Sequence, residues 1–432
     1  MSTAHLLKKD RRSIAIGGPA KYIVGIVGIN VTPKQILNTN TNRLPQPDAA
    51  SLEHSERVRR HIQHIIVDAG GSIGFAEFMQ HALYAKGLGY YSAGAIKFGE
   101  TGDFITAPEI SPLFGKILAN QVSAVLEQIP DVALRSVLEV GAGSGALAVD
   151  LLRRLEVLDS LPSRYFILEV SPDLQQRQLA AIESAMPHFV DKVEWLSGWP
   201  ENVCGAIVAN EVLDAMPVER FVKRDGQVAR QTVIATDDGF AWASMPAPDI
   251  LTAAVKAIEA NIGQELPDGY ESEVSLGVAE WLSDLANCLQ LGFVFLFDYG
   301  VSEREYYASD RSNGWLRCHF RHHAHSDPLI YPGIQDLTAW VDFSRVANAA
   351  YDSGLQIAGY VNQGQFLLQG GLMGELGDIA RMPTDAQIAL SQQVKLLTMP
   401  GEMGENFKCL GLSKGAIDAP ELFSLSDRSH TL

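Results

Sequence analysis

Apolar residues recur every three or four positions in several segments of the chain, a spacing that gathers them on one face of a helix. The first two segments cover residues 56–68 and 75–86. A third begins at Ser111-Pro112, a favourable pair for a helix N-terminus, and continues to Ile129. Between the second and third lies a glycine- and aromatic-rich stretch without periodicity, which we expect to be an ordered functional loop. Further helices are expected at residues 250–261, 278–290, 337–352 and 386–397, the third ended by Gly354.

Short continuous apolar runs predict the buried strands of a parallel sheet. These runs occupy residues 136–140, 164–170, 192–196, 205–210 and 293–300, and helical segments between them make right-handed βαβ units. Residues 221–244 break the rhythm: Asp225-Gly226 and Asp238-Gly239 separate β-prone runs and predict an antiparallel insertion. Late strands are expected at 357–361, 365–369 and 408–413, and a long polar, His-rich loop before residue 337.

The expected fold class is therefore α/β. It is a Rossmann-like sheet of about seven strands with N-terminal helices and a small inserted antiparallel and helical region. We divide the chain into a variable N-terminal extension (1–50), an N-terminal helical region with a cofactor or substrate loop (51–130), a core (131–415) with the insertion at about 221–277, and a C-terminal tail (416–432).

The composition of the chain limits the binding partners and the compartment that we expect for it. A formal charge of −17 argues against nucleic acid, because a phosphate backbone needs a basic face. No apolar run reaches the ~20 residues of a membrane helix, so we expect no membrane insertion. The four cysteines contain no CxxC pair, which fits a reducing compartment. Residues 1–45 carry seven Lys/Arg against one Asp, which permits either a mitochondrial transit peptide or a variable extension.

The candidate ligand site is the stretch SVLEVGAGSGALAVDL at residues 136–151. Its turn contains Gly141, Ala142, Gly143 and Gly145, and such a turn lets a ligand lie against bare N–H groups at a helix N-terminus. Gly141, Gly143 and Ala146 also satisfy G-x-G-x-x-A, a weak dinucleotide-binding pattern. The turn alone therefore indicates a nucleotide-like ligand without naming it.

Three polar positions around the turn favour a different ligand. Glu139 lies in the strand just before the glycines, where a ligand with an ammonium group would need an acid. Glu169 ends the second strand and suits ribose hydroxyls, although NAD sites also use an acid there. Asn210-Glu211 end the fourth strand at the carboxyl edge of the sheet, where open α/β folds bind ligands.

Together these features resemble the class I S-adenosylmethionine-dependent methyltransferases, whose motif is a hydrophobic-acid-hydrophobic strand followed by Gly-x-Gly-x-Gly. The resemblance narrows to the MidA-like methyltransferases. It rests on GDFITAPEISPLFG (102–115), LEVGAGSGALAVD (138–150), VANEVLDAMPVERF (208–221), FDYG (297–300), GIQDLTAWVDFS (333–344) and MGENFK (403–408), and it runs from about residue 51 to 415. His323 and Trp340 depart from the family pattern, which favours Arg and His there.

The resemblance implies S-adenosyl-L-methionine as cofactor and a class I methyltransferase sheet. It also implies a protein substrate: the family's mitochondrial member dimethylates a subunit arginine during assembly of respiratory complex I. The implied catalytic loop resembles the paired-glutamate loop of protein arginine methyltransferases, with Glu211 as main guanidinium ligand and Asp214 or Glu219 assisting. The alternative for Asp214 and Glu219 is charge at a helix start. The expected cofactor-binding residues are Asp103, Thr106, Glu139, Gly141, Ala142, Gly143, Gly145, Glu169 and Asn210.

Several alternatives stay open at this point. The chain could be a non-catalytic assembly factor that binds S-adenosylmethionine, or an NAD-dependent oxidoreductase. CHFRHHAH at residues 318–325 is expected to be a polar substrate-facing loop and not a metal site, because clustered histidines alone are a poor predictor of zinc. We expect the cytoplasm of a bacterium, with the mitochondrial matrix as the alternative. A homodimer is left open.

Overall fold

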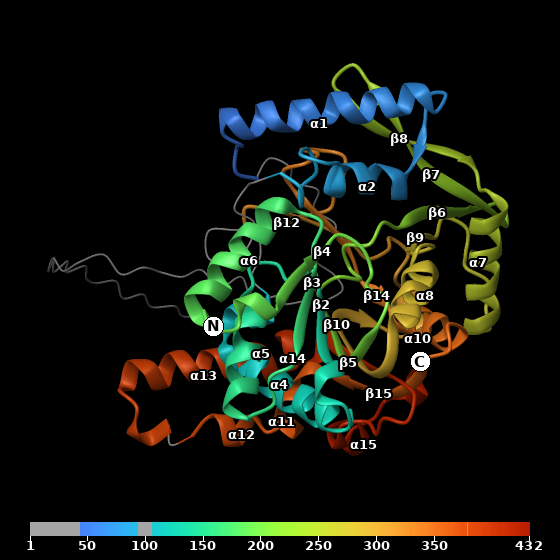
Figure 1. The fold of residues 1–432 in the computed structure, drawn as a ribbon. Helices are drawn as coiled ribbons and strands as arrows, with labels where there is room; N and C mark the ends of the chain where they lie inside the picture. The colour runs from blue at the N-terminus through green and yellow to red at the C-terminus, as the bar shows by residue number, and fades with distance from the viewer. Residues whose placement is uncertain (1–43, 94–105, 378) are drawn as a thin grey trace, which may run out of the picture.

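A mixed sheet flanked by helices forms the centre of the computed structural model, which describes residues 44–93, 106–377 and 379–432 (Figure 1). Its strand order is β15-β16-β10-β5-β2-β3-β4, and β14 pairs with β10 at one end. Strands β10, β5, β2, β3 and β4 run parallel, whereas β16 is antiparallel to both β10 and β15. The bounds of the sheet strands are β2 Arg135–Val140, β3 Arg164–Leu168, β4 Val193–Leu196, β5 Val203–Asn210, β10 Leu289–Val301, β14 Val341–Asp342, β15 Gln356–Asn362 and β16 Phe407–Lys414.

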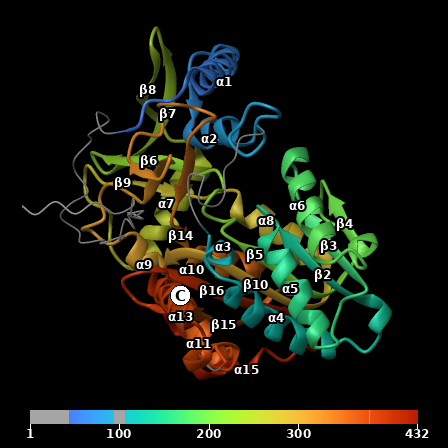
Figure 2. The same cartoon turned by 90° about the vertical axis from the view of Figure 1, so that its left-hand side faces the viewer.

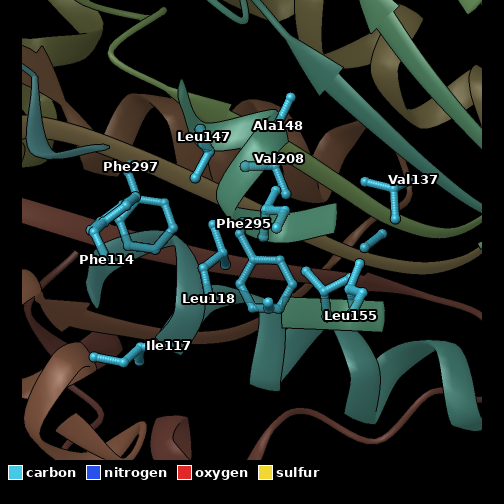
Figure 3. Packing of buried hydrophobic residues seen from close by; sticks show 14 of the residues in the cluster. Phe114, Ile117, Leu118, Val137, Leu147, Ala148, Leu155, Val208, Phe295 and Phe297 are labelled. Carbon is cyan, nitrogen blue, oxygen red and sulfur yellow. The ribbon is translucent and has the colours of Figure 1, made fainter. Parts of the chain in front are cut away.

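Helices cover both faces of this sheet (Figure 2). On one face α4 and α5 pack against β5 and β10, and Figure 3 shows Phe114 and Leu118 of α4 against Phe295 and Phe297 of β10. On the other face α8 and α10 cover β5, β10 and β16. The bounds of the helices that contact the sheet or follow it are α3 Ala107–Ile110, α4 Pro112–Glu127, α5 Ala146–Val157, α6 Pro172–Ala185, α8 Val278–Cys288, α9 Glu303–Tyr306, α10 Phe343–Asp352, α11 Gln363–Gln369, α12 Leu372–Glu375, α13 Thr384–Thr398, α14 Met403–Asn406 and α15 Glu421–Leu425.

A second body of structure lies over the carboxyl edge of the sheet, at the top of Figure 1. It contains a five-stranded antiparallel sheet, β1-β7-β6-β9 with β8 on β7, and a three-stranded sheet, β12-β11-β13. Helices α1 and α2 pack on it through one apolar cluster and α7 through another. We call this body the cap; its bounds are α1 Ala49–Asp68, β1 Ile73–Gly74, α2 Phe75–Tyr84, β6 Glu219–Arg224, β7 Gln227–Thr236, β8 Gly239–Pro246, α7 Asp249–Ile262, β9 Glu271–Val274, β11 Leu316–Phe320, β12 His323–His325 and β13 Asp336–Ala339.

The α/β fold class and the antiparallel insertion are confirmed, and three local expectations are wrong. The His-rich segment is not a loop: β11 and β12 form a hairpin across Arg321-His322, and both turn residues have positive φ. Residues 337–339 belong to β13 and the expected helix begins only at Phe343, because Asp342 caps it there. Residues 365–369 lie in α11 instead of a strand, since Asn362 accepts the Gln365 N–H and starts a helix.

Candidate functional site

The glycine turn joins β2 to α5 in a backbone conformation that side chains would disfavour. Gly141, Gly143 and Gly145 have φ of 68°, 53° and 85°. The Gly141 N–H donates to Leu168 O (3.0 Å), which fastens the turn to the end of β3. Gly145 is the N-cap of α5 and carries no side chain, so the N-terminus of α5 is left open to a ligand.

Gln178 of α6 holds the turn from behind, and sequence reasoning missed it. The side chain is fully buried; its Nε2 donates to Gly143 O (3.0 Å) and to Glu169 Oε2 (3.1 Å). Its Oε1 accepts from Trp195 Nε1 (2.9 Å). The available signal was its position: Leu174, Gln178 and Ile182 share the buried face of α6, and a polar residue on an apolar face needs partners.

Glu139 and Glu169 both lie toward the carboxyl edge of the sheet, as expected from their strand positions. Glu139 is 2% exposed, and the Tyr165 hydroxyl donates to its Oε2 (2.6 Å). Burial raises the pKa of Glu139 to about 7, the hydrogen bond from Tyr165 opposes the rise, and the charge of Glu169 adds to it. The Oε1 of Glu169 accepts from Ser171 N–H (2.9 Å), so this carboxylate is oriented by the start of α6.

Asn210 is the last residue of β5 and Glu211 follows it at the same edge. Glu211 has φ of 54°, an uncommon conformation for a residue with a side chain, and its N–H donates to Phe297 O (2.9 Å). Asn210 Nδ2 donates to Glu211 Oε1 (3.3 Å), while Asn210 Oδ1 is buried without a partner in the described structure. The pKa of Glu211 is raised to about 8, chiefly by burial and next by the charge of Asp214, although hydrogen bonds from Asn210 and the Ala107 N–H lower it.

Asp214 lies in the loop between β5 and β6 and is 5% exposed. Its Oδ2 accepts from the Tyr299 hydroxyl (2.5 Å), and its Oδ1 is buried without a partner among the described residues. Burial raises the pKa of Asp214, and the Tyr299 hydrogen bond opposes that rise. Asp298 supports this loop from β10: its Oδ2 accepts from Leu213 N–H (2.9 Å) and Asp214 N–H (3.1 Å).

Two tyrosines that sequence reasoning did not select extend the site toward the cap. Tyr84 and Tyr91 stack with ring centroids 5.5 Å apart. The Tyr84 hydroxyl donates to Ala215 O (2.9 Å) and the Tyr91 hydroxyl to Asp336 Oδ1 (2.8 Å). We call Glu211, Asp214, Asp298 and Asp336 the acidic cluster. The pKa of Tyr91 is raised first by burial and then by the charges of Asp336 and Asp214, so these two carboxylates lie near the stacked tyrosine rings.

Not every selected residue has a side chain that is free to act at this edge. Glu219 is engaged by the protein's own Arg230, whose Nε donates to Oε2 (2.8 Å) and whose Nη2 contacts Oε1, so both carboxylate oxygens are occupied. Thr106 caps α3 in a capping box with Glu109. Asp103 lies outside the described residues.

The described residues contain neither a set of converging metal ligands nor a disulfide. Within residues 44–93, 106–377 and 379–432, no three His, Cys, Asp or Glu side chains converge on a position that suits a metal ion. His319 is buried, and burial lowers its pKa to about 4. All four cysteines are free. No helix in the described part of the chain combines the length and apolarity that a bilayer span requires.

Comparison with known proteins identifies a family. Residues 117–361 match the model of a family described as "Putative S-adenosyl-L-methionine-dependent methyltransferase". A Burkholderia thailandensis protein crystallised with S-adenosyl-homocysteine is similar in fold and sequence: the TM-score is 0.83 and the identity 37%, over 90% of this chain and 100% of that chain.

Named relatives also match over most of their length. The mitochondrial protein arginine methyltransferase NDUFAF7 of Mus musculus is 30% identical over 83% of this chain and 85% of its own length. The NDUFAF7 homolog of Drosophila melanogaster is 28% identical over 87% of this chain and 89% of its own length.

Proposed function

Because this chain belongs to the MidA-like family of S-adenosyl-L-methionine-dependent methyltransferases, we propose that its methyl acceptor is an arginine side chain of a client protein. The observation that carries the proposal is the pair Glu211 and Asp214, two carboxyl groups held at the carboxyl edge of β5 beside the glycine turn. A guanidinium needs bidentate carboxylate partners, and Asp214 Oδ1 is buried without a partner among the described residues. The names of the mouse and fly relatives support the same acceptor. The dinucleotide alternative is not retained, since the Burkholderia neighbour holds S-adenosyl-homocysteine.

The residues around the turn fit the cofactor. The backbone N–H groups from Gly141 to Gly145 and the open N-terminus of α5 suit its polar groups, and buried Glu139 suits its ammonium. We assign the ribose hydroxyls to Glu169 and the adenosine side of the site to Ala142 and Asn210. The cofactor, when bound, supplies an electrophilic methyl group. Thr106 has a structural role in α3, and Asp103 keeps its assignment from the family resemblance alone.

The acidic residues position the acceptor and take up its proton. Glu211 accepts two N–H bonds from the guanidinium and fixes its plane. An arginine nitrogen that gains a methyl group must lose a proton, and a carboxyl group with a raised pKa is a better proton acceptor than an ordinary one. Asp214, oriented by Tyr299, assists from the loop. Glu219 is assigned to the cap, because Arg230 occupies both its oxygens.

The test is transfer of label from S-adenosyl-L-methionine to arginine in a co-purifying client, read by mass spectrometry. A subunit of respiratory complex I is the first client to examine, and the number of methyl groups is read from the same spectra. Glu211→Gln should lower the rate about a hundredfold while S-adenosyl-homocysteine binding, measured by calorimetry, is unchanged. Glu194→Gln, at an exposed glutamate of β4, is the matched control and should keep full activity.

Two outcomes would contradict the proposal. Equal rates for wild type and Glu211→Gln would remove Glu211 from the reaction. Stable client binding with no methylarginine in any wild-type sample would favour a non-catalytic assembly factor. The compartment is also proposed: a bacterial cytoplasm, with the mitochondrial matrix as the alternative, since the animal relatives are named as mitochondrial.

A further inference from the structure

Arg317 is a half-buried arginine of β11 whose side chain shares a face of the three-stranded sheet with Asp336 of the acidic cluster. In the register of the three-stranded sheet, Arg317 is opposite Thr338 and His319 is opposite Asp336. Directly opposite residues of antiparallel strands lie on the same face. The alternate residues Leu316 and Cys318 are buried in the apolar cluster of the cap, so Arg317 and His319 face away from that core.

This face of β11 and β13 forms a wall of the proposed acceptor site. Asp336 of β13 accepts from Tyr91, and the Ala339 N–H at the end of β13 donates to Asp214 O (2.9 Å). Tyr299, the hydrogen-bond partner of Asp214, lies near Arg317. Thr338 Oγ1, directly across from Arg317, is buried without a hydrogen-bond partner in the described residues.

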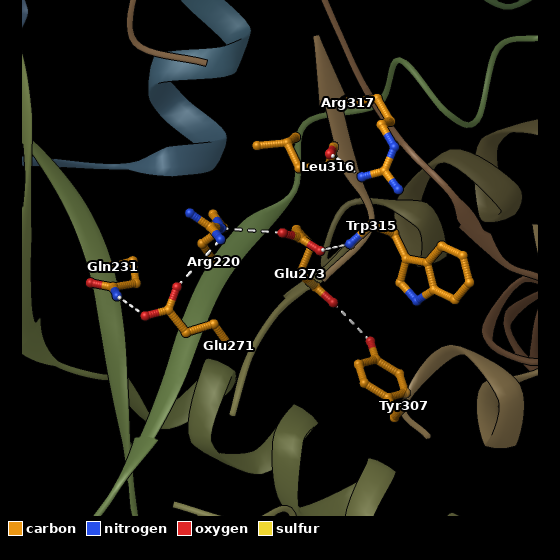
Figure 4. Close-up of polar contacts among 8 residues, drawn as sticks. All are labelled: Arg220, Gln231, Glu271, Glu273, Tyr307, Trp315, Leu316 and Arg317. Atoms are coloured by element: carbon orange, nitrogen blue, oxygen red, sulfur yellow. Dashed lines mark hydrogen bonds and ion pairs between the residues drawn. The ribbon is translucent and has the colours of Figure 1, made fainter. Parts of the chain in front are cut away.

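The charge of Arg317 has no ion-pair partner in the part of the chain that the structure describes. Its one hydrogen bond runs from Nη1 to Leu316 O (2.9 Å), as Figure 4 shows. The carboxylate that most offsets its charge, Glu273, already accepts from Arg220 Nε (3.1 Å) and Trp315 N–H (2.8 Å). Burial accordingly lowers the pKa of Arg317. His319 beside it is neutral at pH 7, because burial holds its pKa at about 4.

Arg220 provides the contrast within the same network. Both of its contacts in Figure 4 are to carboxylates, Glu273 at 3.1 Å and Glu271 at 3.5 Å. Burying a charge without a partner raises the free energy of the protein, and a ligand that supplies the opposite charge offsets this penalty. An arginine fork recognises a planar carboxylate best, since two parallel N–H bonds reach its two oxygens.

We propose that Arg317 binds an aspartate or glutamate side chain of the client, close to the arginine that the acidic cluster receives. This inference rests on the proposed arginine methyltransferase function. The site would then have two charged subsites: carboxylates for the target guanidinium, and a single guanidinium for an acidic neighbour. The substrate class is an exposed segment that carries arginine and an acidic residue within reach of one another. A client that carries only basic residues around the target would leave Arg317 unpaired.

The experiment measures methylation of arginine peptides that carry a single Asp, or the matched Asn, at each flanking position in turn. For wild type, Asp at one or more positions should raise kcat/KM about tenfold over Asn, mainly through KM. Arg317→Met should erase that preference, so that its kcat/KM is the same for each Asp peptide and its matched Asn peptide, and Arg317→Glu should favour Lys at the same position. Arg220→Met is the control: it breaks a buried ion pair and lowers thermal stability but keeps the Asp preference.

The outcomes separate the two levels of inference. If wild type methylates the Asp and Asn peptides equally well, or Arg317→Met keeps the preference, the acidic subsite is overturned and arginine methylation stands. In a further peptide the free carboxyl terminus is placed at the flanking position. If this terminus raises kcat/KM and an internal Asp at the same position does not, the ligand is a chain end and the side-chain assignment is overturned. If no arginine peptide or client is methylated, the proposed function fails and this inference falls with it. Arg317→Met should melt no lower than wild type, since it leaves no carboxylate unpaired.

Discussion

Glu211→Gln should make the protein more stable than wild type at alkaline pH, although it removes a residue assigned to the reaction. The pKa of Glu211 is raised from 4.5 to about 8, so between these values the native state binds more protons at this site than the unfolded state. Stability therefore falls as pH rises from about 4.5 to about 8, and glutamine, which cannot ionise, escapes the loss.

The size of the effect follows from the same numbers. A rise from 4.5 to about 8 corresponds to an upper limit of about 5 kcal/mol, since each pH unit is worth about 1.4 kcal/mol. The side chain is only half-buried, and solvent screening reduces this to about 1–3 kcal/mol. With an unfolding entropy of roughly 0.9 kcal/mol per kelvin for 432 residues, Tm should rise by about 1–3 °C.

The assay is the difference in Tm between variant and wild type, followed by intrinsic fluorescence from pH 5 to pH 9 without cofactor. The difference should be near zero at pH 5 and reach its maximum above pH 8. Glu194→Gln, at an exposed glutamate, should give a flat difference over the same range. A flat difference for Glu211→Gln, or a variant that loses stability relative to wild type as pH rises, would refute the account of Glu211 as a carboxyl group held against ionisation.

Three further variants test the supports of the site. Tyr299→Phe removes the hydrogen bond that lowers the pKa of Asp214. The acidic limb of the pH–rate profile should therefore move to higher pH by as much as about one unit. An acidic limb that does not move would contradict the role of this pair. Gln178→Ala should weaken S-adenosyl-homocysteine binding, measured by calorimetry, at least about tenfold and should lower Tm. The reason is that Gly143, Glu169 and Trp195 all lose a hydrogen-bond partner. Unchanged affinity would show that the glycine turn keeps its shape without Gln178. Gly145→Ala should lower the free energy of unfolding by about 1–2 kcal/mol and weaken binding of the same ligand, since φ is 85° and the new Cβ would lie 3.1 Å from Gln178 Cα. Gly198→Ala, with open space around the new Cβ, is the neutral control.

The positions of the sheet strands along the chain could be predicted because each signal was local. Continuous apolar runs, glycine turns and Ser-Pro helix starts are readable from adjacent residues, and they placed β2, β3, β5 and β10 correctly. The positions of Glu139, Glu169 and Glu211 followed, since a residue at the carboxyl end of a parallel strand has one edge to face. Family membership then supplied the cofactor.

The parts of the fold and of the site that could not be predicted depend on contacts between segments far apart in the sequence. The β11–β12 hairpin turns at Arg321-His322, a pair without the Gly or Asn that usually signals such a turn. Glu219 could not be separated from Glu211 by sequence, because its partner Arg230 comes from the next strand of the cap. Tyr84 and Tyr91 were read as part of a helix and a loop, and their hydrogen bonds go to residues 131 and 245 positions away.

The two-residue strand β1 has a consequence for biosynthesis. Ile73 pairs with Val233, so 160 residues separate this strand from its partner, and the apolar faces of α1 and α2 pack on the same late segments. At about 5–20 residues per second, a ribosome takes about 8–32 s to make the intervening chain. While that stretch is being made, the apolar residues of α1 and α2 that pack on β7 lack their partner strand, and exposed apolar surface of this kind is what chaperones bind. The cap that encloses the proposed acceptor site is thus assembled from the first and later parts of the chain, after most of the central sheet has been made.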